Sequence, residues 1–427
     1  MPRIQSRSRT VTRMAGVVMA ALCMTALLSC GKSCTKTPSP VTNTNTSTNS
    51  RPIERPVATS GALQFIRVAI LKDAAQVRIA AGDSGARIIA PTGTELRRIP
   101  ARTSVALTAT AGGINLDGAL NITDGALRIE SLNPGESLAL DDQDLAPELI
   151  LFRPQRGPKM TVVARLNLED YLGGVLAGEV PYERWHPEAM KAQAITSRTF
   201  ALYQLGKSAA APYDVESTIM SQVFKPGARN HPAIATAVNS TRGMALTNDG
   251  AVFCAYFHST CGSHTEPGQL VFPDANNVAA LRGVECNHCA QSPAYRWRAT
   301  FSKSALEQKL KVSHPTLGTI ARLEFLNAAG QPLRQYERAT LVKVHHSGGV
   351  LSLQGNQFRL LADPKALKSL SFESVTERGD SIDVAGAGFG HGVGLCQWGS
   401  QGLALSGYPY MQILGKYFPG AELTRMY

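Results

Sequence analysis

The sequence of 427 residues has one long apolar run, from Met14 to Leu28. No other window approaches the roughly 18 apolar residues that a transmembrane helix needs, so we expect no membrane-spanning helix in the processed chain. The chain also lacks a basic run and a patch of interleaved basic and aromatic residues, which argues against nucleic acid as a partner. The formal net charge of +11 suits a solvated surface, and it also suits attraction to anionic wall polymers or lipid headgroups.

The first 30 residues have the pattern of an export signal. Four arginines precede the apolar run, which ends with Ser29 directly before Cys30. This pattern is typical of a bacterial lipoprotein signal, in which Cys30 becomes the acylated first residue. An ordinary cleaved signal peptide with an incidental Cys30 is the alternative. We therefore expect an exported protein of the cell envelope that faces the periplasm or wall and is anchored to a membrane by its lipid.

The rest of the chain divides by composition. Residues 31–60 are rich in Thr, Ser, Asn and Pro and predict a disordered tether. Residues 61–160 show short β-rich pieces between glycine and asparagine turns, and residues 161–427 mix strands with helices around an insert at about 298–340. Within residues 161–427, the segment from Leu351 to Leu361 predicts two strands joined by a glycine turn. The expected fold class is α+β, mostly β with a few helices, and there is no internal repeat.

One segment places a single acid in an apolar, proline-bent turn. It runs from Gly178 to Ala201 as GEVPYERWHPEAMKAQAITSRTFA, and its acid is Glu179. A long helix follows to about Gln204, with Pro187 in its first turn. A carboxyl group in apolar surroundings resists ionisation, as a general acid must at neutral pH. Glu179 is therefore the candidate catalytic acid, and a surface glutamate at a turn is the alternative.

A second segment, GAGFGHGVGLCQWG from Gly386 to Gly399, surrounds His391 with glycines. Glycine permits backbone conformations and close ligand approach that other residues exclude. We expect His391, with Gln397 on the following helix, to face a substrate cleft. A tight turn around a packed histidine is the alternative.

Both segments resemble the stage II sporulation protein D family, which includes the amidase-enhancer proteins. The family pattern has an E-x-P turn, a tryptophan, E-A-x-K-A-Q-A and an R-T pair, all present between Glu179 and Thr199. It continues here with YDV, SQVF, AVNSTRG, FHSTCGSHTE and ILGKYFPG, in one order over nearly everything after residue 61. Several separated motifs in the same order make chance agreement very improbable.

The resemblance implies a lytic transglycosylase that cleaves the linkage between N-acetylmuramic acid and N-acetylglucosamine in peptidoglycan glycan strands. The sugar's own C6 hydroxyl attacks the anomeric carbon and leaves a 1,6-anhydro end, so Glu179 alone serves as acid and then as base. Other glycosidases usually need two carboxylates, and Glu183 would support such a hydrolysis. A rival function from a different class is a non-catalytic glycan-binding protein that stimulates a cell-wall amidase.

The expected substrate cleft includes two cations of the long helix. Lys191 and Arg198 lie two turns apart on one face, where they would stabilise negative charge on Glu179 or hold the glycan. The family motif carries a lysine and an arginine at this spacing, although a structural ion pair or an exposed face is the alternative. The other residues that we expect in the cleft are His391, Gln397, Ser259, Tyr256 and Gln222.

The cysteines beyond residue 250 predict a metal site. The pairs CxxH and CxxC supply four ligands at spacings that favour tetrahedral zinc: Cys261, His264, Cys286 and Cys289. His258 or His288 could replace one of them, and members of the family are variable in carrying such a site. Zinc with four protein ligands would be structural. Disulfide bonds between these cysteines are the alternative to zinc, because an exported protein enters an oxidising compartment.

The chain departs from the family pattern in two places. Leu270-Val271-Phe272 stands where many members carry a tryptophan, and Cys396 and Trp398 stand where small and tyrosyl residues are frequent. Both departures concern the shape of the substrate groove more than the reaction.

Overall fold

The computed structural model describes residues 64–427 except 124, 154–156, 209, 219–220 and 277. The predicted export signal, the lipid-anchored Cys30 and the tether at 31–60 lie outside the described residues. The described part has seven α-helices and several sheets, and it confirms the predicted β-rich α+β class. None of its helices is long and apolar enough to cross a bilayer.

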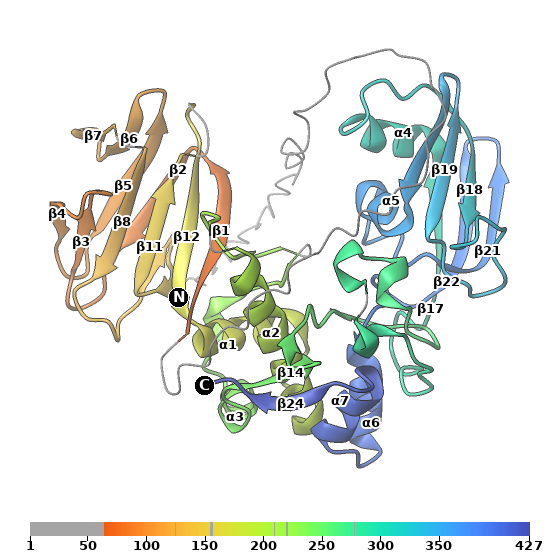
Figure 1. The fold of residues 1–427 in the computed structure, drawn as a ribbon. Helices are drawn as coiled ribbons and strands as arrows, with labels where there is room; N and C mark the ends of the chain where they lie inside the picture. The colour runs from red at the N-terminus through yellow and green to blue at the C-terminus, as the bar shows by residue number, and fades with distance from the viewer. Residues whose placement is uncertain (1–63, 124, 154–156, 209, 219–220, 277) are drawn as a thin grey trace, which may run out of the picture. The chain divides into compact units, whose positions relative to one another are not determined.

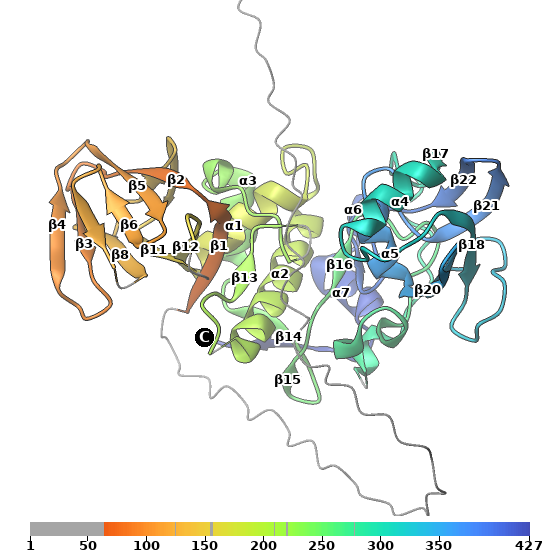
Figure 2. The same ribbon diagram turned by 90° about the horizontal axis from the view of Figure 1, so that it is seen from above.

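Two sheets dominate the first hundred described residues (Figures 1 and 2). One has the strand order β13-β1-β12-β11-β8-β3-β4 and the other has the order β10-β9-β2-β5-β6-β7. Alternating burial shows why these strands form: in β5 every second residue, Val105, Leu107 and Ala109, enters the core. The strands are β1 (Phe65–Ala74), β2 (Gln76–Ala80), β3 (Ala86–Ile89), β4 (Glu95–Ile99), β5 (Ser104–Thr110), β6 (Gly113–Leu116), β7 (Leu120–Ile122), β8 (Ala126–Ser131), β9 (Leu138–Leu140), β10 (Gln143–Ala146), β11 (Glu148–Phe152) and β12 (Met160–Asn167).

Two helices follow β12 directly. They are α1 (Leu168–Glu179) and the long α2 (Pro187–Lys207), which matches the helix predicted after the acidic turn. Pro187 is the first residue of α2, and the His186 ring caps the helix by accepting a hydrogen bond from the Glu188 N–H at 3.2 Å. One hydrophobic core runs from the two sheets into both helices, so the boundary near residue 160 stays a prediction.

The middle and the end of the chain complete this core. Strand β16 pairs in parallel with β23, with Phe257 opposite Leu395 and His258 opposite Cys396, so two distant sequence motifs meet. The elements are β13 (Val215–Glu216), η1 (Pro226–Ala228), α3 (Pro232–Ser240), β14 (Met244–Asn248), β15 (Ala251–Val252), β16 (Phe257–His258), η2 (Gly268–Leu270), η3 (Pro273–Ala275), η4 (Ala279–Leu281), β23 (Leu395–Cys396), α6 (Gln397–Leu405), α7 (Tyr410–Tyr417) and β24 (Glu422–Arg425).

A second hydrophobic core uses residues between Trp297 and Val384. Its elements are β17 (Arg296–Ser302), α4 (Lys303–Lys311), β18 (Ile320–Leu326), β19 (Leu341–His346), β20 (Gly349–Gln354), α5 (Gly355–Ala362), β21 (Ser371–Arg378) and β22 (Ser381–Ala387). The prediction of two strands between Leu351 and Leu361 is wrong in its second half. Phe358 and Ala362 are buried four residues apart, the spacing of one helix face, and the chain forms α5 there.

Candidate active site

Glu179 is the last residue of α1, and the local sequence explains why the helix stops there. The Asn167 side chain caps the start of the helix by accepting a hydrogen bond from the Glu169 N–H at 2.9 Å. Pro181 cannot continue a helix and disfavours helical geometry at Val180, which is extended with φ −129° and ψ 151°. The chain therefore turns directly after Glu179, at the end of a mostly buried helix.

Two glycines of α1 let the following loop lie directly against the helix. A Cβ added at Gly174 would overlap the Phe224 ring, and one added at Gly178 would overlap the Val223 carbonyl oxygen. Only glycine permits such a close approach. The Lys225 N–H also donates to Gly174 O at 2.9 Å, which fixes the loop at this place.

This loop brings a hydrogen-bond donor to the Glu179 carboxyl group. The Val223 backbone N–H donates to Glu179 Oε1 at 2.7 Å. Burial raises the pKa of Glu179 from 4.5 to about 7, while the Val223 N–H, the Gln397 amide and the Lys225 charge lower it by less. Glu179 is therefore close to half protonated at neutral pH, which suits a group that gives and then accepts a proton.

A buried layer next to Glu179 joins α1, the loop and α2. Tyr171 OH donates to Gln222 Oε1 at 2.9 Å, and Gln222 Nε2 donates to Ser197 O at 3.4 Å. Burial, together with the charge of Glu179, raises the pKa of Tyr171 well above its usual value. Gln222 is completely buried, so it supports the site from within and does not line a substrate cleft.

The glycine-rich segment supplies Gln397, the first residue of α6, as a neighbour of Glu179. The Gln397 amide lies close enough to lower the pKa of the carboxyl group. Gln397 is only 6% exposed, and its Nε2 makes no well-aligned hydrogen bond to any described residue. The structure thus brings these two residues together and leaves a buried donor beside the acid.

The cation that acts on Glu179 is Lys225, an exposed residue of the loop, and neither predicted helix cation takes this place. Lys191 forms an ion pair with Glu188 at 2.7 Å and lies 5.7 Å from the centroid of the Tyr410 ring. Lys191 therefore forms a structural ion pair, which is the alternative given above for this residue. The sequence contained a clue to the position of Lys225 in the site, because this residue directly follows the SQVF motif.

Arg198 has a structural role. Its guanidinium binds both carboxylate oxygens of Glu169, from Nε to Oε1 at 3.1 Å and from Nη2 to Oε2 at 2.7 Å. It also donates to Met244 O at 3.0 Å, and Glu169 Oε1 accepts a hydrogen bond from Tyr427 OH at 2.6 Å. The network joins α1, α2 and the last residue of the chain. The structure therefore gives no support to the expectation that Arg198 contacts substrate, because its side chain is 0% exposed.

His391 is held in the glycine-rich loop by backbone groups. Its Nε2 donates to Phe257 O at 2.8 Å, and its Nδ1 accepts a hydrogen bond from the Val393 N–H at 3.1 Å. Burial keeps the pKa of His391 well below its usual value, so the ring is neutral. Both ring nitrogens are occupied, and a hydrogen bond from His391 to a sugar would require one of these bonds to break.

An aromatic wall stands beside this loop. The rings of Tyr256 and Phe272 stack with centroids 4.1 Å apart, and both rings meet the His391 ring at a steep angle. Phe272 belongs to the stretch that departs from the family pattern, and it supplies an aromatic ring near the position of the frequent tryptophan. Ser259 is half-buried on the same segment, and its hydroxyl lies 3.4 Å from the Thr260 hydroxyl.

Four buried cysteines converge near the start of α6. The sulfurs of Cys261, Cys286, Cys289 and Cys396 all lie within 4.8 Å of one another, and no disulfide joins these four residues. Four sulfurs placed tetrahedrally at about 2.3 Å from zinc would be about 3.8 Å apart, so this set is compatible with a structural zinc ion.

Hydrogen-bond donors surround two sulfurs of this cluster. The backbone N–H groups of Cys261 and Gly399 each donate to Cys396 Sγ at 3.3 Å. Tyr417 OH lies 3.0 Å from Cys286 Sγ. Donors of this kind orient and stabilise metal-bound sulfur, so the second layer of contacts also fits a metal.

The ligand set differs from the predicted one by one member. His264 lies outside the sulfur cluster, because its Nε2 is 2.9 Å from Glu266 Oε1 and its Nδ1 is 3.2 Å from Ser263 Oγ. Cys396 takes the fourth place, brought to Cys261 by the pairing of β16 with β23. The structure therefore favours Cys396 over the predicted His264 as the fourth ligand. Cys261 and Cys396 are 135 positions apart, so spacing rules within one segment cannot detect that they meet.

Comparison with known proteins identifies the family. A family model described as stage II sporulation protein matches residues 156–248, which include α1, α2 and the loop that binds Glu179. A stage II sporulation protein D of Bacillus amyloliquefaciens is 31% identical over 277 residues, which cover 61% of this chain and 75% of that protein. This chain belongs to the stage II sporulation protein D family.

Two further relatives agree with this membership. An uncharacterized protein of Brachyspira hyodysenteriae is 33% identical over 268 residues, which are 62% of this chain and 68% of that protein. An amidase enhancer of Bacillus subtilis is 25% identical over 296 residues, which are 59% of this chain and 40% of that protein. The resemblance drawn from the sequence motifs is confirmed.

Proposed function

We propose that this member of the stage II sporulation protein D family is a peptidoglycan lytic transglycosylase that uses Glu179 first as acid and then as base. The observation that carries the proposal is one half-buried carboxyl group with a pKa near 7, held by the Val223 N–H. Family membership supports a substrate in the cell wall.

The proposed reaction returns the enzyme to its starting state. Protonated Glu179 donates to the oxygen that links N-acetylmuramic acid to N-acetylglucosamine, as the bond from that oxygen to the anomeric carbon breaks. The C6 hydroxyl of the same muramic acid bonds to the anomeric carbon and gives its proton to Glu179. One product has a new free hydroxyl, and the other has a 1,6-anhydro end.

The contacts of Glu179 support roles for three neighbours in the proposed reaction. Because Oε1 accepts from Val223, the transferable proton lies on Oε2. Lys225 stabilises the carboxylate after the first proton transfer. Gln397 Nε2, a buried donor without a well-aligned partner among the described residues, binds a sugar hydroxyl or acetamide oxygen.

Hydrolysis by two carboxylates fits this site less well. Such enzymes place their second carboxyl group within about 5–10 Å of the first. The groups in the described part that shift the pKa of Glu179 include no other carboxylate. Glu183, the predicted second acid, is exposed.

Mass spectrometry of digested glycan strands tests the proposal. Purified protein is incubated with strands that carry stem peptides and with strands stripped of them, and product ends are identified. The proposal requires anhydro ends from the wild type and none from Glu179→Gln. Reducing ends would indicate a hydrolase.

A non-catalytic role in stimulating an amidase is the second candidate, because one relative is named an amidase enhancer. In that case the wild type and Glu179→Gln would bind glycan equally, release no products alone and accelerate a cell-wall amidase equally. Products that depend on Glu179 would exclude this candidate as the sole function.

We also propose that Cys261, Cys286, Cys289 and Cys396 hold one structural zinc ion. The proximity of the four sulfurs and the N–H donors to Cys396 support this assignment. Zinc would connect the loop before β17 to the start of α6, next to Gln397, and four sulfur ligands leave no position for a reacting water. Metal analysis of protein purified without chelator should find about one zinc per chain.

The proposed substrate requires export, and the sequence pattern around Cys30 supports a lipid anchor. In cells given labelled palmitate, the wild-type protein should carry the label and Cys30→Ala should not. An unlabelled wild type would instead favour an ordinary cleaved signal peptide.

A further inference from the structure

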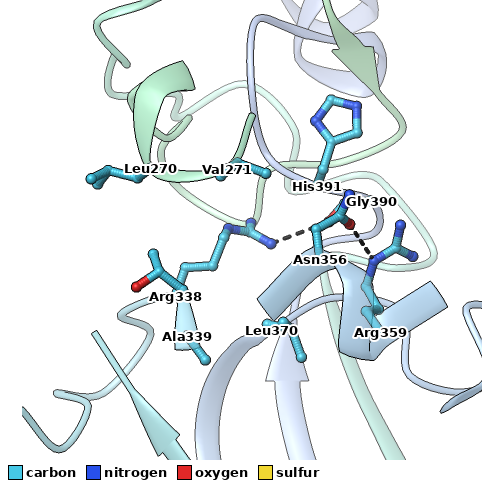
Figure 3. A pocket seen from close by; sticks show the side chains of 10 residues that line it. Leu270, Val271, Arg338, Ala339, Asn356, Arg359, Leu370, Gly390 and His391 are labelled. Carbon is cyan, nitrogen blue, oxygen red and sulfur yellow. Dashed lines mark hydrogen bonds between the residues drawn. The ribbon is translucent and has the colours of Figure 1, made fainter. Parts of the chain in front are cut away.

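Two buried arginines line a small pocket together with Asn356, Gly390 and His391 (Figure 3). Arg338 is 5% exposed and Arg359 is 6% exposed. Figure 3 shows their side chains on either side of Asn356. Because arginine keeps its charge in proteins, two positive charges are withdrawn from solvent at one place.

The charge of Arg338 is partly compensated. Its Nη1 donates to Gly390 O at 3.1 Å, and its Nε lies 3.5 Å from Glu266 Oε1 without a well-aligned hydrogen bond. Glu266 is shared with His264, which lies 2.9 Å from the same oxygen. The guanidinium packs directly on Gly392, where a Cβ would lie 2.6 Å from Nη2.

Arg359 has no carboxylate partner among the described residues. Its Nε donates to Asn356 Oδ1 at 3.2 Å, which is a neutral acceptor. Burial and the charge of Arg338 lower the pKa of Arg359 to about 10, which leaves it charged at neutral pH. The nearby rings of His258 and His391 are neutral, since burial lowers the pKa of both. The pocket therefore holds more positive than negative charge, and such burial is costly unless an anion joins it.

We propose that this pocket binds one carboxylate group of a ligand between Arg338 and Arg359. The planar fork of a guanidinium matches the two oxygens of a carboxylate. The free space is about 10 Å³, enough for about one water-sized group. This size excludes a whole sugar ring and admits one carboxylate oxygen between the two arginines, while the rest of the ligand lies outside the narrow space. Leu270 and Val271 also line the pocket and would contact the carbon next to the carboxylate.

The carboxylate has two possible sources. It is either a free small anion or the lactyl carboxylate of muramic acid, which is free in glycan strands without stem peptides. The second identification rests on the proposed function, whereas the site itself does not. The test is therefore a binding measurement that requires no catalysis.

The first experiment measures the melting temperature of the purified protein at constant ionic strength. The probes are acetate, N-acetylmuramic acid and N-acetylglucosamine, which lacks the lactyl carboxylate. We expect acetate and N-acetylmuramic acid to raise the Tm by about 2 °C or more, in a concentration-dependent manner. Arg359→Gln should abolish the response. Arg378→Gln, a control whose side chain is 76% exposed, should keep it.

A second variant keeps the test valid if Arg359→Gln fails to fold. Asn356→Asp places a carboxylate of the same shape next to Arg359, so it should raise the Tm without acetate and remove the response to acetate. Gln357→Glu adds a charge to the same first turn of α5 at an exposed position and serves as its control. This control should respond to acetate like the wild type.

The outcomes separate the sources. A larger shift with N-acetylmuramic acid than with acetate, and none with N-acetylglucosamine, identifies a carboxylate carried by glycan. Equal shifts with both carboxylates identify a free anion. The proposal is overturned if the wild type responds to neither carboxylate, or if Arg359→Gln and Asn356→Asp respond as the wild type does.

Discussion

The Val223 backbone N–H donates to Glu179 Oε1 at 2.7 Å, at a contact that the absence of a side chain on Gly178 makes possible. The bond ties the acid to a loop that comes 44 residues later in the chain. It leaves one carboxyl oxygen to carry the transferable proton, while burial keeps that proton in place near neutral pH. The position and the acidity of Glu179 therefore depend on the same packed loop.

Gly178→Ala tests this packing. The added methyl group overlaps the Val223 carbonyl oxygen, so the loop must move and the bond to Glu179 lengthens. We expect a loss of about 1–3 kcal/mol in the free energy of unfolding and a fall in activity of about tenfold or more. Gly206→Ala is the matched control, since no atom lies near its added Cβ at the end of α2, and it should stabilise the protein slightly. Equal behaviour of the two variants would contradict the packing account.

Glu179→Gln keeps the size of the side chain and removes its proton chemistry. Activity on glycan strands should fall about 10²–10⁴-fold, and the circular dichroism spectrum should not change. Glu183→Gln is the control, because Glu183 is exposed, and it should keep nearly full activity. A large loss in Glu183→Gln would instead indicate a two-carboxylate mechanism.

The raised pKa of Glu179 predicts a pH dependence of stability. Between about pH 4.5 and about pH 7 the folded protein holds a proton that the unfolded chain has released, so the free energy of unfolding falls as pH rises through this window. The partial exposure of Glu179 limits the effect to about 1–3 kcal/mol. Urea unfolding at both ends of the window measures it. In Glu179→Gln this component should be missing, and an unchanged pH profile would show that the folded pKa is ordinary.

Arg198 should matter for folding, because it is buried in an ion pair with Glu169. Arg198→Met leaves a buried carboxylate without its partner, which should cost about 3–5 kcal/mol in urea unfolding. The double variant Arg198→Met with Glu169→Gln should regain part of this loss. Wild-type stability in Arg198→Met, combined with lost activity, would show that the arginine acts on substrate after all.

The cysteine cluster predicts a loss of zinc in one variant and no change in another. Cys396→Ser removes one of the four sulfurs, so it should lower zinc content and the Tm. His264→Ala removes a residue that lies outside the cluster, and its zinc content should stay at about one per chain. Zinc loss in His264→Ala without loss in Cys396→Ser would restore the predicted ligand set.

The sequence predicted those helices and turns that depend on neighbouring residues in the chain. Pro181 and Pro187 delimit the turn between α1 and α2, and the apolar spacing after Pro187 gave the long helix. The class of the fold and the family followed from strand-like alternation and from ordered motifs. The CxxC pair, Cys286 and Cys289, also emerged from spacing alone.

Contacts between distant segments were harder to predict. Cys396 was visible as a departure from the family pattern, but only the pairing of β16 with β23 brings it to Cys261. Arg198 shares a helix face with Lys191, yet its burial depends on Glu169 one helix earlier. The role of the glycines at 174 and 178 was not predicted, because the loop that packs on them comes from a later part of the chain.

Digestion of glycan strands in water labelled with heavy oxygen tests the central claim most directly. If Glu179 accepts the proton of the sugar's own C6 hydroxyl, the new ends are 1,6-anhydro rings. These ends contain no label and are lighter than reducing ends by the mass of one water molecule. Label incorporated at the anomeric carbon of the new ends would show that water is the nucleophile and would contradict the account.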